Sequence, residues 1–352
     1  MRATLLTIFA TTLCAGEPDP LLLLENGHCK RARDLAEAAF RAHPNDAQTA
    51  YLMARVRHEL GNIDEAVKYA EIAVKLDPKS SQYHRELGEA LADQAGNVSF
   101  LKQLGFARRV RSEFDTALAL APKDPDNLFD QLQYYMEAPG VVGGDKRKAE
   151  QIANEMVSID PARGYLALAF IARKQKEDSK LEGLYQKAVE SNPRNSEVQI
   201  RLAAFYADAK RMNLPSAEKH ARDAVEFFPD RVEGYRWLAL TLVLEKRFDD
   251  AAKLLSRAEG AIPDDLSPFY YAARALLRDG TDMPKAESYL QKYISQTKEP
   301  EAGAPSLAAA HWSLGLAFEK EGRKSDARNE METALRLKPD FEPAKKDFKR
   351  LK

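Results

Sequence analysis

Histidine and cysteine, the side chains most often used in metal centres and nucleophilic sites, are few and scattered in this chain. The six histidines stand at positions 28, 43, 58, 84, 220 and 311, so no two form the His-x-x-x-His pair of a zinc-binding helix. His28 precedes Cys29, but the sequence places no further ligands near this pair. Nucleophile-elbow, phosphate-loop and calcium-loop motifs are also missing. We therefore predict no catalytic residue, no cofactor and no metal, and expect that the protein is not an enzyme.

The charge balance argues against a nucleic-acid partner. The chain of 352 residues carries 53 Lys and Arg against 54 Asp and Glu, a net charge of −1. Nucleic-acid binding usually needs a strong positive field. We expect a protein or peptide partner and no binding to nucleic acid.

One segment outside any regular pattern is a candidate recognition loop: residues 138–145, which contain Pro139, Val141, Val142, Gly143 and Gly144. Proline should stop the preceding helix, and the two glycines permit a turn with positive φ. Two interpretations stay open. The segment is either a specialised turn that packs its valine tip on the neighbouring unit, or a recognition loop acting with a second insertion at residues 97–108.

An internal repeat supplies the helices that carry these residues. Small residues and a closing proline recur about every 34 residues, as in Ala66, Ala70, Ala73 and Pro78. The three alanines fall on one helical face and let two helices approach closely. Units of this length stack because none can bury its apolar face alone. Nine units are expected, ending near residues 44, 78, 122, 161, 193, 229, 263, 298 and 339. We expect the segment 297–305, which precedes the last unit, to be a flexible connector.

These residues resemble the tetratricopeptide repeat family. The stretches HWSLGLAFEKEGRKSDARNEMETALRLKP (311–339) and YRWLALTLVLEKRFDDAAKLLSRAEGAIP (235–263) match most positions of its pattern. The resemblance, which extends over about residues 20–340, implies an all-α fold: a right-handed α-solenoid of about nine helix pairs. We assign it to residues 17–340. Residues 341–352 follow as a capping helix with an apolar stripe at Phe341, Ala344, Phe348 and Leu351.

The resemblance also implies where a partner would bind. Members of the family usually bind peptides or helices on the concave surface lined by the first helix of each unit. The asparagines with which the family's carboxylate-binding members hold an acidic C-terminus are missing here. The corresponding candidate groove residues of this chain are Tyr51, Arg55, His58, Phe170, Arg173, Arg236, Leu240 and Trp312.

The N-terminus resembles a secretory signal. Residues 1–16 contain one arginine, an apolar stretch and small residues suited to cleavage before Glu17. A lipoprotein signal using Cys14 fits less well, because bulky Leu13 precedes it. We expect export to the periplasm or out of a bacterial cell, and no integral membrane segment in the mature chain. The predicted function is a non-catalytic interaction scaffold of the bacterial envelope. The alternative is an accessory subunit bound permanently to an envelope enzyme or transporter.

Overall fold

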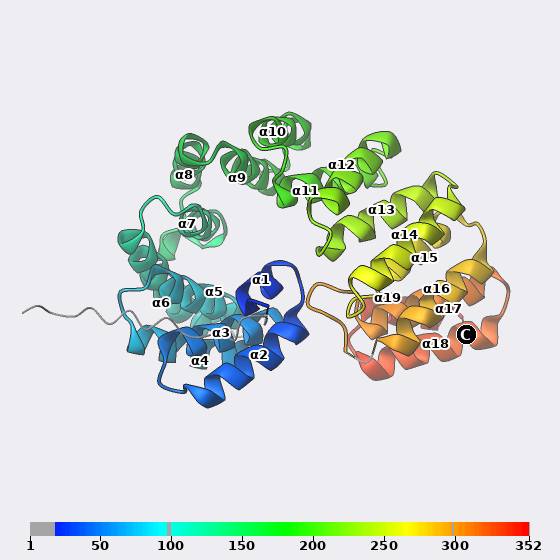
Figure 1. Ribbon diagram of the computed structural model, residues 1–352, viewed down its shortest axis with the longest axis horizontal. Helices are drawn as coiled ribbons and strands as arrows, with labels where there is room; N and C mark the ends of the chain where they lie inside the picture. The colour runs from blue at the N-terminus through cyan, green and yellow to red at the C-terminus, as the bar shows by residue number, and fades with distance from the viewer. Residues whose placement is uncertain (1–17, 97–99, 298, 352) are drawn as a thin grey trace, which may run out of the picture.

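The computed structural model describes residues 18–96, 100–297 and 299–351, so the predicted signal peptide at 1–16 lies outside the described residues. The described chain is a solenoid of nine helix pairs followed by a capping helix, without strands, as the repeat predicts (Figure 1). The pairs are α1 (Pro20–Glu25) with α2 (Cys29–Ala42), α3 (Ala47–Glu59) with α4 (Ile63–Leu76), α5 (Ser81–Gly96) with α6 (Phe100–Leu120), α7 (Pro125–Glu137) with α8 (Lys146–Ile159), α9 (Pro161–Lys174) with α10 (Asp178–Ser191), α11 (Ser196–Ala207) with α12 (Leu214–Phe227), α13 (Val232–Leu244) with α14 (Phe248–Ala261), α15 (Ser267–Asp279) with α16 (Met283–Gln296), and α17 (Leu307–Lys320) with α18 (Lys324–Leu337).

The predicted alanine face is the contact surface between helices. Ala66, Ala70 and Ala73 on α4 have no exposed surface, and Ala66 and Ala70 share a core cluster with Leu87 of the next unit. Small side chains at these positions allow close helix packing. The same arrangement recurs at Ala327 and Ala334 of α18.

Local sequence explains the helix boundaries. Asp46 and Asp124 cap their helices by accepting hydrogen bonds from backbone amides, such as Gln48 N to Asp46 Oδ1 at 2.7 Å. Gly61 ends the turn after α3 with φ of 75°. Pro161 has a different role from the one predicted: it is the first residue of α9 rather than a residue beyond the end of α8.

Both ends of the solenoid are covered. The capping helix α19 (Glu342–Arg350) buries Ala344, and Phe341 lies edge-on to Trp312 with ring centroids 5.9 Å apart. At the other end Leu23 and Leu24 of α1 are buried in a cluster with Leu52 of the second unit. The apolar faces that a terminal repeat would expose are therefore occupied.

The extra residues of the third unit do not form the insertion loop expected at 97–108. From Phe100 onward they belong to α6, which is 21 residues long. Residues 97–99 lie outside the described part. The extra length is therefore added to a helix and not to a loop.

The solenoid also closes on itself. The segment before α17, expected to be a flexible connector, is held against the start of α2: Lys30 Nζ donates to the Glu299 carbonyl oxygen at 2.7 Å, and the Lys30 amide donates to Glu301 Oε2 at 3.2 Å. Glu301 is buried. Figure 1 shows α1 and α2 beside this loop, so the helix pairs form a ring. Of the helices in the described residues, none has the length and apolar character needed to cross a membrane.

Candidate partner-binding site

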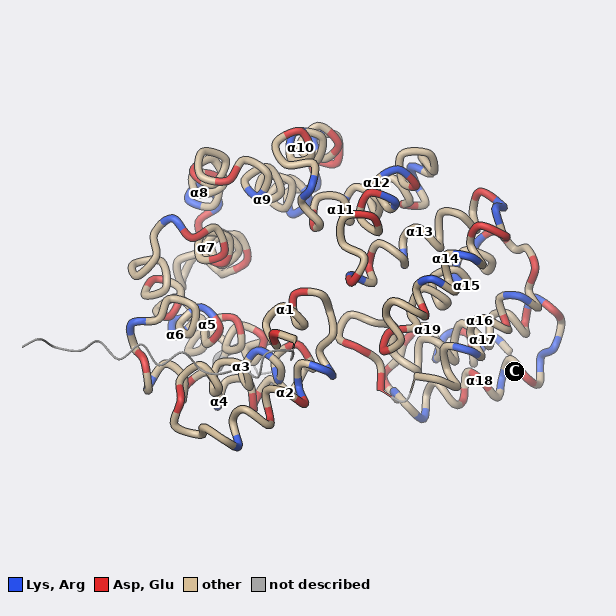
Figure 2. Tube along the Cα trace, viewed as in Figure 1, with Lys and Arg blue, Asp and Glu red and all other residues tan. Residues whose placement is uncertain are grey.

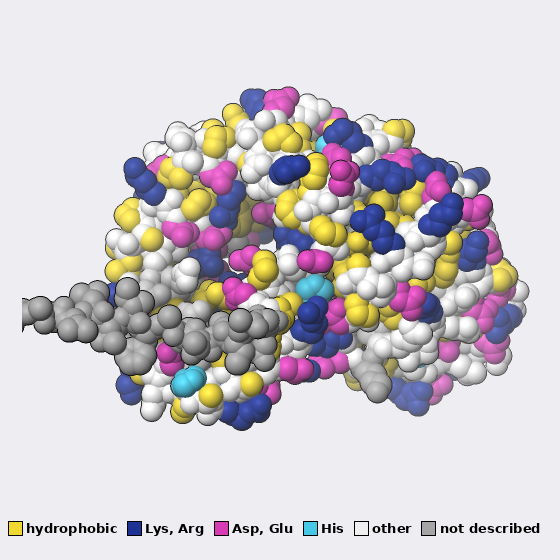
Figure 3. All heavy atoms as spheres, in the orientation of Figure 1, with side chains coloured by type: hydrophobic (Ala, Val, Ile, Leu, Met, Phe, Trp, Pro, Cys, Tyr) yellow, Lys and Arg dark blue, Asp and Glu magenta, His cyan; other side chains and the backbone are white. Residues whose placement is uncertain are grey.

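The inner surface of the ring is lined by the first helices of the pairs, such as α3, α5, α7 and α9 (Figure 1). Charged side chains form ion pairs between successive members of these four helices. The molecule is hollowed at its centre, with acidic and basic side chains bordering the hollow (Figure 3). Along the described part of the chain, Lys and Arg are interspersed with Asp and Glu, without a large region of one sign (Figure 2). What marks the inner surface is therefore local clusters of charged side chains rather than an overall charge of one sign.

Glu86 of α5 is the centre of the first cluster. Its side chain is only 1% exposed, yet it is ionically paired on two sides, with Arg55 Nε at 3.4 Å and His58 Nδ1 at 3.0 Å. The second ring nitrogen of His58 lies 3.1 Å from Asp93 Oδ2. Burial by itself would lower the pKa of His58, but the hydrogen bonds and charges of Glu86 and Asp93 outweigh burial and raise it to about 9. His58 is therefore an imidazolium at neutral pH.

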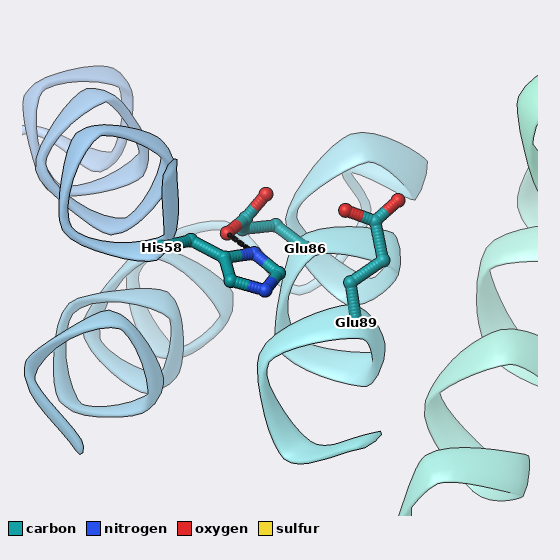
Figure 4. Close-up of side chains that lie close together, drawn as sticks. All are labelled: His58, Glu86 and Glu89. Atoms are coloured by element: carbon teal, nitrogen blue, oxygen red, sulfur yellow. Dashed lines mark hydrogen bonds and ion pairs between the residues drawn. The ribbon is translucent and has the colours of Figure 1, made fainter. Parts of the chain in front are cut away.

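His58, Glu86 and Glu89 lie close enough to suggest a metal site, with ligand atoms within 4.8 Å of one another (Figure 4). An imidazolium has no free lone pair for a metal ion, and both ring nitrogens already contact carboxylates. Arg55 supplies a further positive charge to Glu86. The arrangement fits an ion-pair network better than a metal centre.

A second cluster joins α5, α7 and α9. Asp126 accepts from Arg85 Nη1 at 2.9 Å and from Arg163. Burial would raise the pKa of Asp126, but these two guanidinium groups lower it. Arg85 also lies 3.7 Å from Glu89. Charges of successive first helices are therefore linked into a continuous chain across the inner surface.

Glu89 and Asp130 form a pair of a different kind. The two carboxyl groups are within hydrogen-bonding contact, although neither can donate when both are ionised. Among the described residues no Lys, Arg or His lies within 4.0 Å ion-pair distance of Asp130, and its Oδ2 is buried without a hydrogen-bond partner. Burial and the neighbouring Glu89 raise the pKa of Asp130 well above its usual range. The protonated form of Asp130 is therefore favoured over its ionised form more strongly than in an ordinary aspartate.

These carboxyl groups stand in the wall of a pocket of about 460 Å³ between α5, α6 and α7, which we call the α5–α7 pocket. Val110, Phe114, Tyr134 and Val142 give it apolar walls. Its described lining residues include four carboxyl groups and one imidazole but no Lys or Arg. They are His58, Glu89, Ala92, Asp93, Ala95, Gly96, Gln103, Leu104, Ala107, Val110, Phe114, Asp130, Gln133, Tyr134, Glu137, Ala138, Pro139 and Val142.

The two segments that break the repeat meet at this pocket. Leu104 and Ala107 come from the lengthened α6, and Pro139 and Val142 come from the segment 138–145. Each irregularity was visible in the sequence. Their meeting at one pocket was not, because it depends on how α6 packs beside the end of α7.

Within the segment 138–145, Val142 and Val141 have opposite surroundings. Val142 is buried, and its carbonyl oxygen accepts from the Tyr134 hydroxyl at 2.6 Å, whereas Val141 is 80% exposed. Gly143 has φ of 102°, and a β-carbon on Gly144 would overlap the Ala138 carbonyl oxygen. Most of the segment is thus a specialised turn, and Val141 is the part available to a partner.

Three of the predicted groove residues lie in or beside the charged clusters. Arg55 and His58 are the partners of Glu86, and His58 also lines the α5–α7 pocket. Tyr51 is buried, with its ring centroid 5.1 Å from that of Tyr83. Tyr51 therefore contributes to packing between units.

Two more, Phe170 and Arg173, line a smaller cavity of about 60 Å³ further along the inner surface. Phe170 lies edge-on to Phe129 at 5.5 Å, and Arg173 donates to the Tyr185 hydroxyl. Arg163 and Arg201 add positive charge to its wall, which Glu197, paired with Arg201 at 2.7 Å, only partly offsets. Its charge is opposite to that of the α5–α7 pocket.

The remaining three predicted groove residues take part in structural contacts. Arg236 is buried and ion-paired with Asp265 at 2.8 Å. Leu240 is partly buried against the core, and Trp312 donates to Asp347 of the capping helix at 2.8 Å. Partner binding by these eight groove residues remains a prediction, and the geometry favours the part of the groove between α3 and α9.

Family models agree with this architecture. Models described as tetratricopeptide repeat match residues 21–80, 51–99, 202–265 and 308–341, about half of the chain. A comparison with curated proteins finds no match. Among solved structures, the chain is similar to TTC0263, a tetratricopeptide repeat protein of Thermus thermophilus (20% identity, 54% of this chain and 96% of that chain, TM-score 0.47). It is also similar to yeast Tom70 (16%, 94% and 86%, TM-score 0.49) and to a tetratricopeptide repeat protein of Parabacteroides merdae (13%, 87% and 98%, TM-score 0.45). With its nine stacked helix pairs and the matched repeats, the chain belongs to the tetratricopeptide repeat family.

Proposed function

We propose that this protein is a non-catalytic scaffold that binds a segment of a partner protein, a peptide or a helix, on its inner surface at the α5–α7 pocket. The tetratricopeptide repeat fold suggests an interaction scaffold in general. The observation that carries the more specific proposal is the pocket itself, whose walls join His58, Glu89 and Asp130 of three successive first helices to both segments that break the repeat.

The charge pattern supports a peptide or helix that extends along several units. The α5–α7 pocket is acidic and apolar, and the neighbouring cavity beside α9 carries Arg163, Arg173 and Arg201. A segment with charges of both signs at the right spacing would complement both sites. Such complementarity mainly provides specificity and a fast association rate.

Site-specific photocrosslinking tests the binding surface. A photoreactive phenylalanine analogue at Gln133, in the pocket wall, or at exposed Val141 should capture one partner in the native cell. The same analogue at Glu155, exposed on α8, is the control and should capture none. Capture that is equal at all three positions would contradict the proposed surface.

We further propose that the protein is exported and acts in the bacterial envelope. The support is the composition of residues 1–16, with a single positive charge and an apolar core. N-terminal sequencing of the protein recovered from its native compartment should begin at Glu17, and deletion of residues 1–16 should retain the chain in the cytoplasm. A native N-terminus at Met1 would refute export by cleavage.

A further inference from the structure

The α5–α7 pocket has the chemistry to select one kind of partner side chain. Its volume of about 460 Å³ lies within the range of about 300–1,000 Å³ typical of sites for small ligands, so it can hold more than solvent. Phe114, Tyr134 and Val142 form apolar walls, and Glu89, Asp130 and Asp93 are carboxyl groups at its edge. Apolar walls that lead to carboxyl groups suit a long side chain with an aliphatic stem and a cationic end.

Of the two carboxyl groups, only Glu89 has a cation within ion-pair distance among the described residues. Arg85 contacts Glu89 from one side at 3.7 Å, but among the described residues nothing basic lies within ion-pair distance of Asp130. Of the other cations near the pocket, His58 is held by Glu86 and Asp93, and Lys174 contacts Glu137 at 2.6 Å. A guanidinium or ammonium group between Glu89 and Asp130 would give Asp130 Oδ2 the donor that it lacks.

We propose that the α5–α7 pocket binds a lysine or arginine side chain of the partner protein, flanked by apolar residues, with Glu89 and Asp130 as its counter-charges. This inference rests on the proposed function, since it names the feature of the partner that the inner surface recognises. The aromatic walls add a favourable contact with the cation.

Proton release distinguishes this mode of binding from simple burial of an apolar side chain. Without the partner, burial and the adjacent Glu89 raise the pKa of Asp130 well above its usual range, so its protonated form persists to higher pH. The charged groups that act on Asp130 are Glu89 and Arg85 from α5 and Asp126 on α7 itself. His58 of α3, Asp93 of α5 and Glu137 of α7 line the same pocket, whereas α6 contributes no titratable side chain to its described lining. A bound cation stabilises the ionised form of Asp130, so binding favours release of the Asp130 proton to solvent. Affinity should therefore rise with pH above the ordinary range of an aspartate.

Two short peptides on the unaltered full chain provide the test. The probe is acetyl-Leu-Arg-Leu-amide, and its matched control replaces arginine with citrulline, which has nearly the same shape without the charge. We expect the arginine peptide to bind about tenfold or more tightly than the control, with NMR shifts at the residues of the α5–α7 pocket. Calorimetry in buffers of different ionisation enthalpy should detect a proton released on binding. Equal affinity for the two peptides, shifts confined to another surface, or no saturable binding would overturn the inference.

Conservative variants provide the second arm. Asp130→Asn and Glu89→Gln should each weaken binding of the arginine peptide about tenfold, while Glu155→Gln on exposed α8 should leave it unchanged. Circular dichroism of each variant checks that it is folded. A chain that still crosslinks to its partner from Gln133 and Val141, but does not distinguish arginine from citrulline, would retain the proposed function and refute this inference.

Discussion

The imidazole of His28 and the carboxylate of Asp264 lie 2.9 Å apart, although 236 residues separate them in the chain. The other ring nitrogen of His28 contacts the Asp230 carbonyl oxygen at 3.0 Å. These contacts belong to a set that we call the clasp, which joins the first unit to later units and closes the ring. The clasp consists of His28, Lys30, Arg33, Asp264, Glu299 and Glu301.

Reversing the charges of the clasp should open the ring. Lys30 lies 3.6 Å from the buried Glu301 carboxylate, and Arg33 lies 2.9 Å from Glu299. The double variant Lys30→Glu, Arg33→Glu places like charges opposite each other, so we expect a larger radius of gyration in small-angle scattering. Loss of the exposed Arg33 pair costs only about 0–1 kcal/mol, and most of the effect should come from position 30.

Restoring one attraction provides the control for this experiment. Adding Glu299→Arg to the double variant re-creates an ion pair with the new carboxylate at position 33. The radius of gyration should then fall part of the way back to that of the unaltered protein. A radius that is the same for all three proteins would show that the ion pairs do not hold the ring closed.

The clasp should also loosen as pH rises. The hydrogen bond and charge of Asp264 raise the pKa of His28, so its stabilising contribution is complete below about pH 6.5 and is lost as pH rises through the higher folded value. Burial raises the pKa of Glu301 to about 7, despite the opposing charge of Lys30, so ionisation of this group also destabilises the closed form between about pH 4.5 and 7. The pKa of Asp264 is lowered, so protonation of this carboxylate would loosen the clasp as pH falls, but only in strong acid. Together the shifts predict the most compact ring in mildly acidic solution.

Scattering at a series of pH values measures this effect. The radius of gyration should grow from about pH 6 to pH 9. In the variants His28→Asn and Glu301→Gln the radius should depend less strongly on pH. Ionisation of Glu301 alone should destabilise the closed form by roughly 1–3 kcal/mol. A radius of gyration that falls as pH rises would contradict the direction expected from both His28 and Glu301.

The sequence predicted the repeat but not the contacts made across it. Ala66, Ala70 and Pro78 specify a helix pair through local spacing, which is why nine pairs and the capping helix could be predicted. The clasp and the Glu89–Asp130 pair depend on the curvature of the whole solenoid and on packing between units, and no local pattern encodes these. The third unit shows a different limit: residues 100–108 break the 34-residue period but remain compatible with a helix, so an insertion was mistaken for a loop.

Two substitutions in the segment 138–145 should distinguish its contribution to stability from its contribution to partner binding. Gly144→Ala places a β-carbon against the Ala138 carbonyl oxygen and should cost about 2–3 kcal/mol in the free energy of unfolding, measured by urea denaturation. Val141→Ser alters a side chain that is 80% exposed, so it should change stability by no more than about 0.5 kcal/mol. If Val141 is a contact for the partner, its substitution should nevertheless weaken partner capture. A stable variant with undiminished capture would leave the segment a purely structural turn.

Two lysines occupy backbone positions that favour glycine, and replacing them should stabilise the solenoid. Gly61 ends the turn after α3 with φ of 75°, whereas Lys176 and Lys246 have φ of 61° at the corresponding places after α9 and α13. Both lysines are exposed, so their side chains lose little when removed. Glycine relieves the left-handed strain but adds entropy to the unfolded chain, which leaves a net gain of roughly 0.5 kcal/mol for each of Lys176→Gly and Lys246→Gly. Urea denaturation measures the gain, and Lys68→Gly, at an exposed position in the middle of α4, is the matched control that should instead cost about 1 kcal/mol. Destabilisation by all three substitutions would show that the positive φ at positions 176 and 246 carries no strain that glycine can relieve.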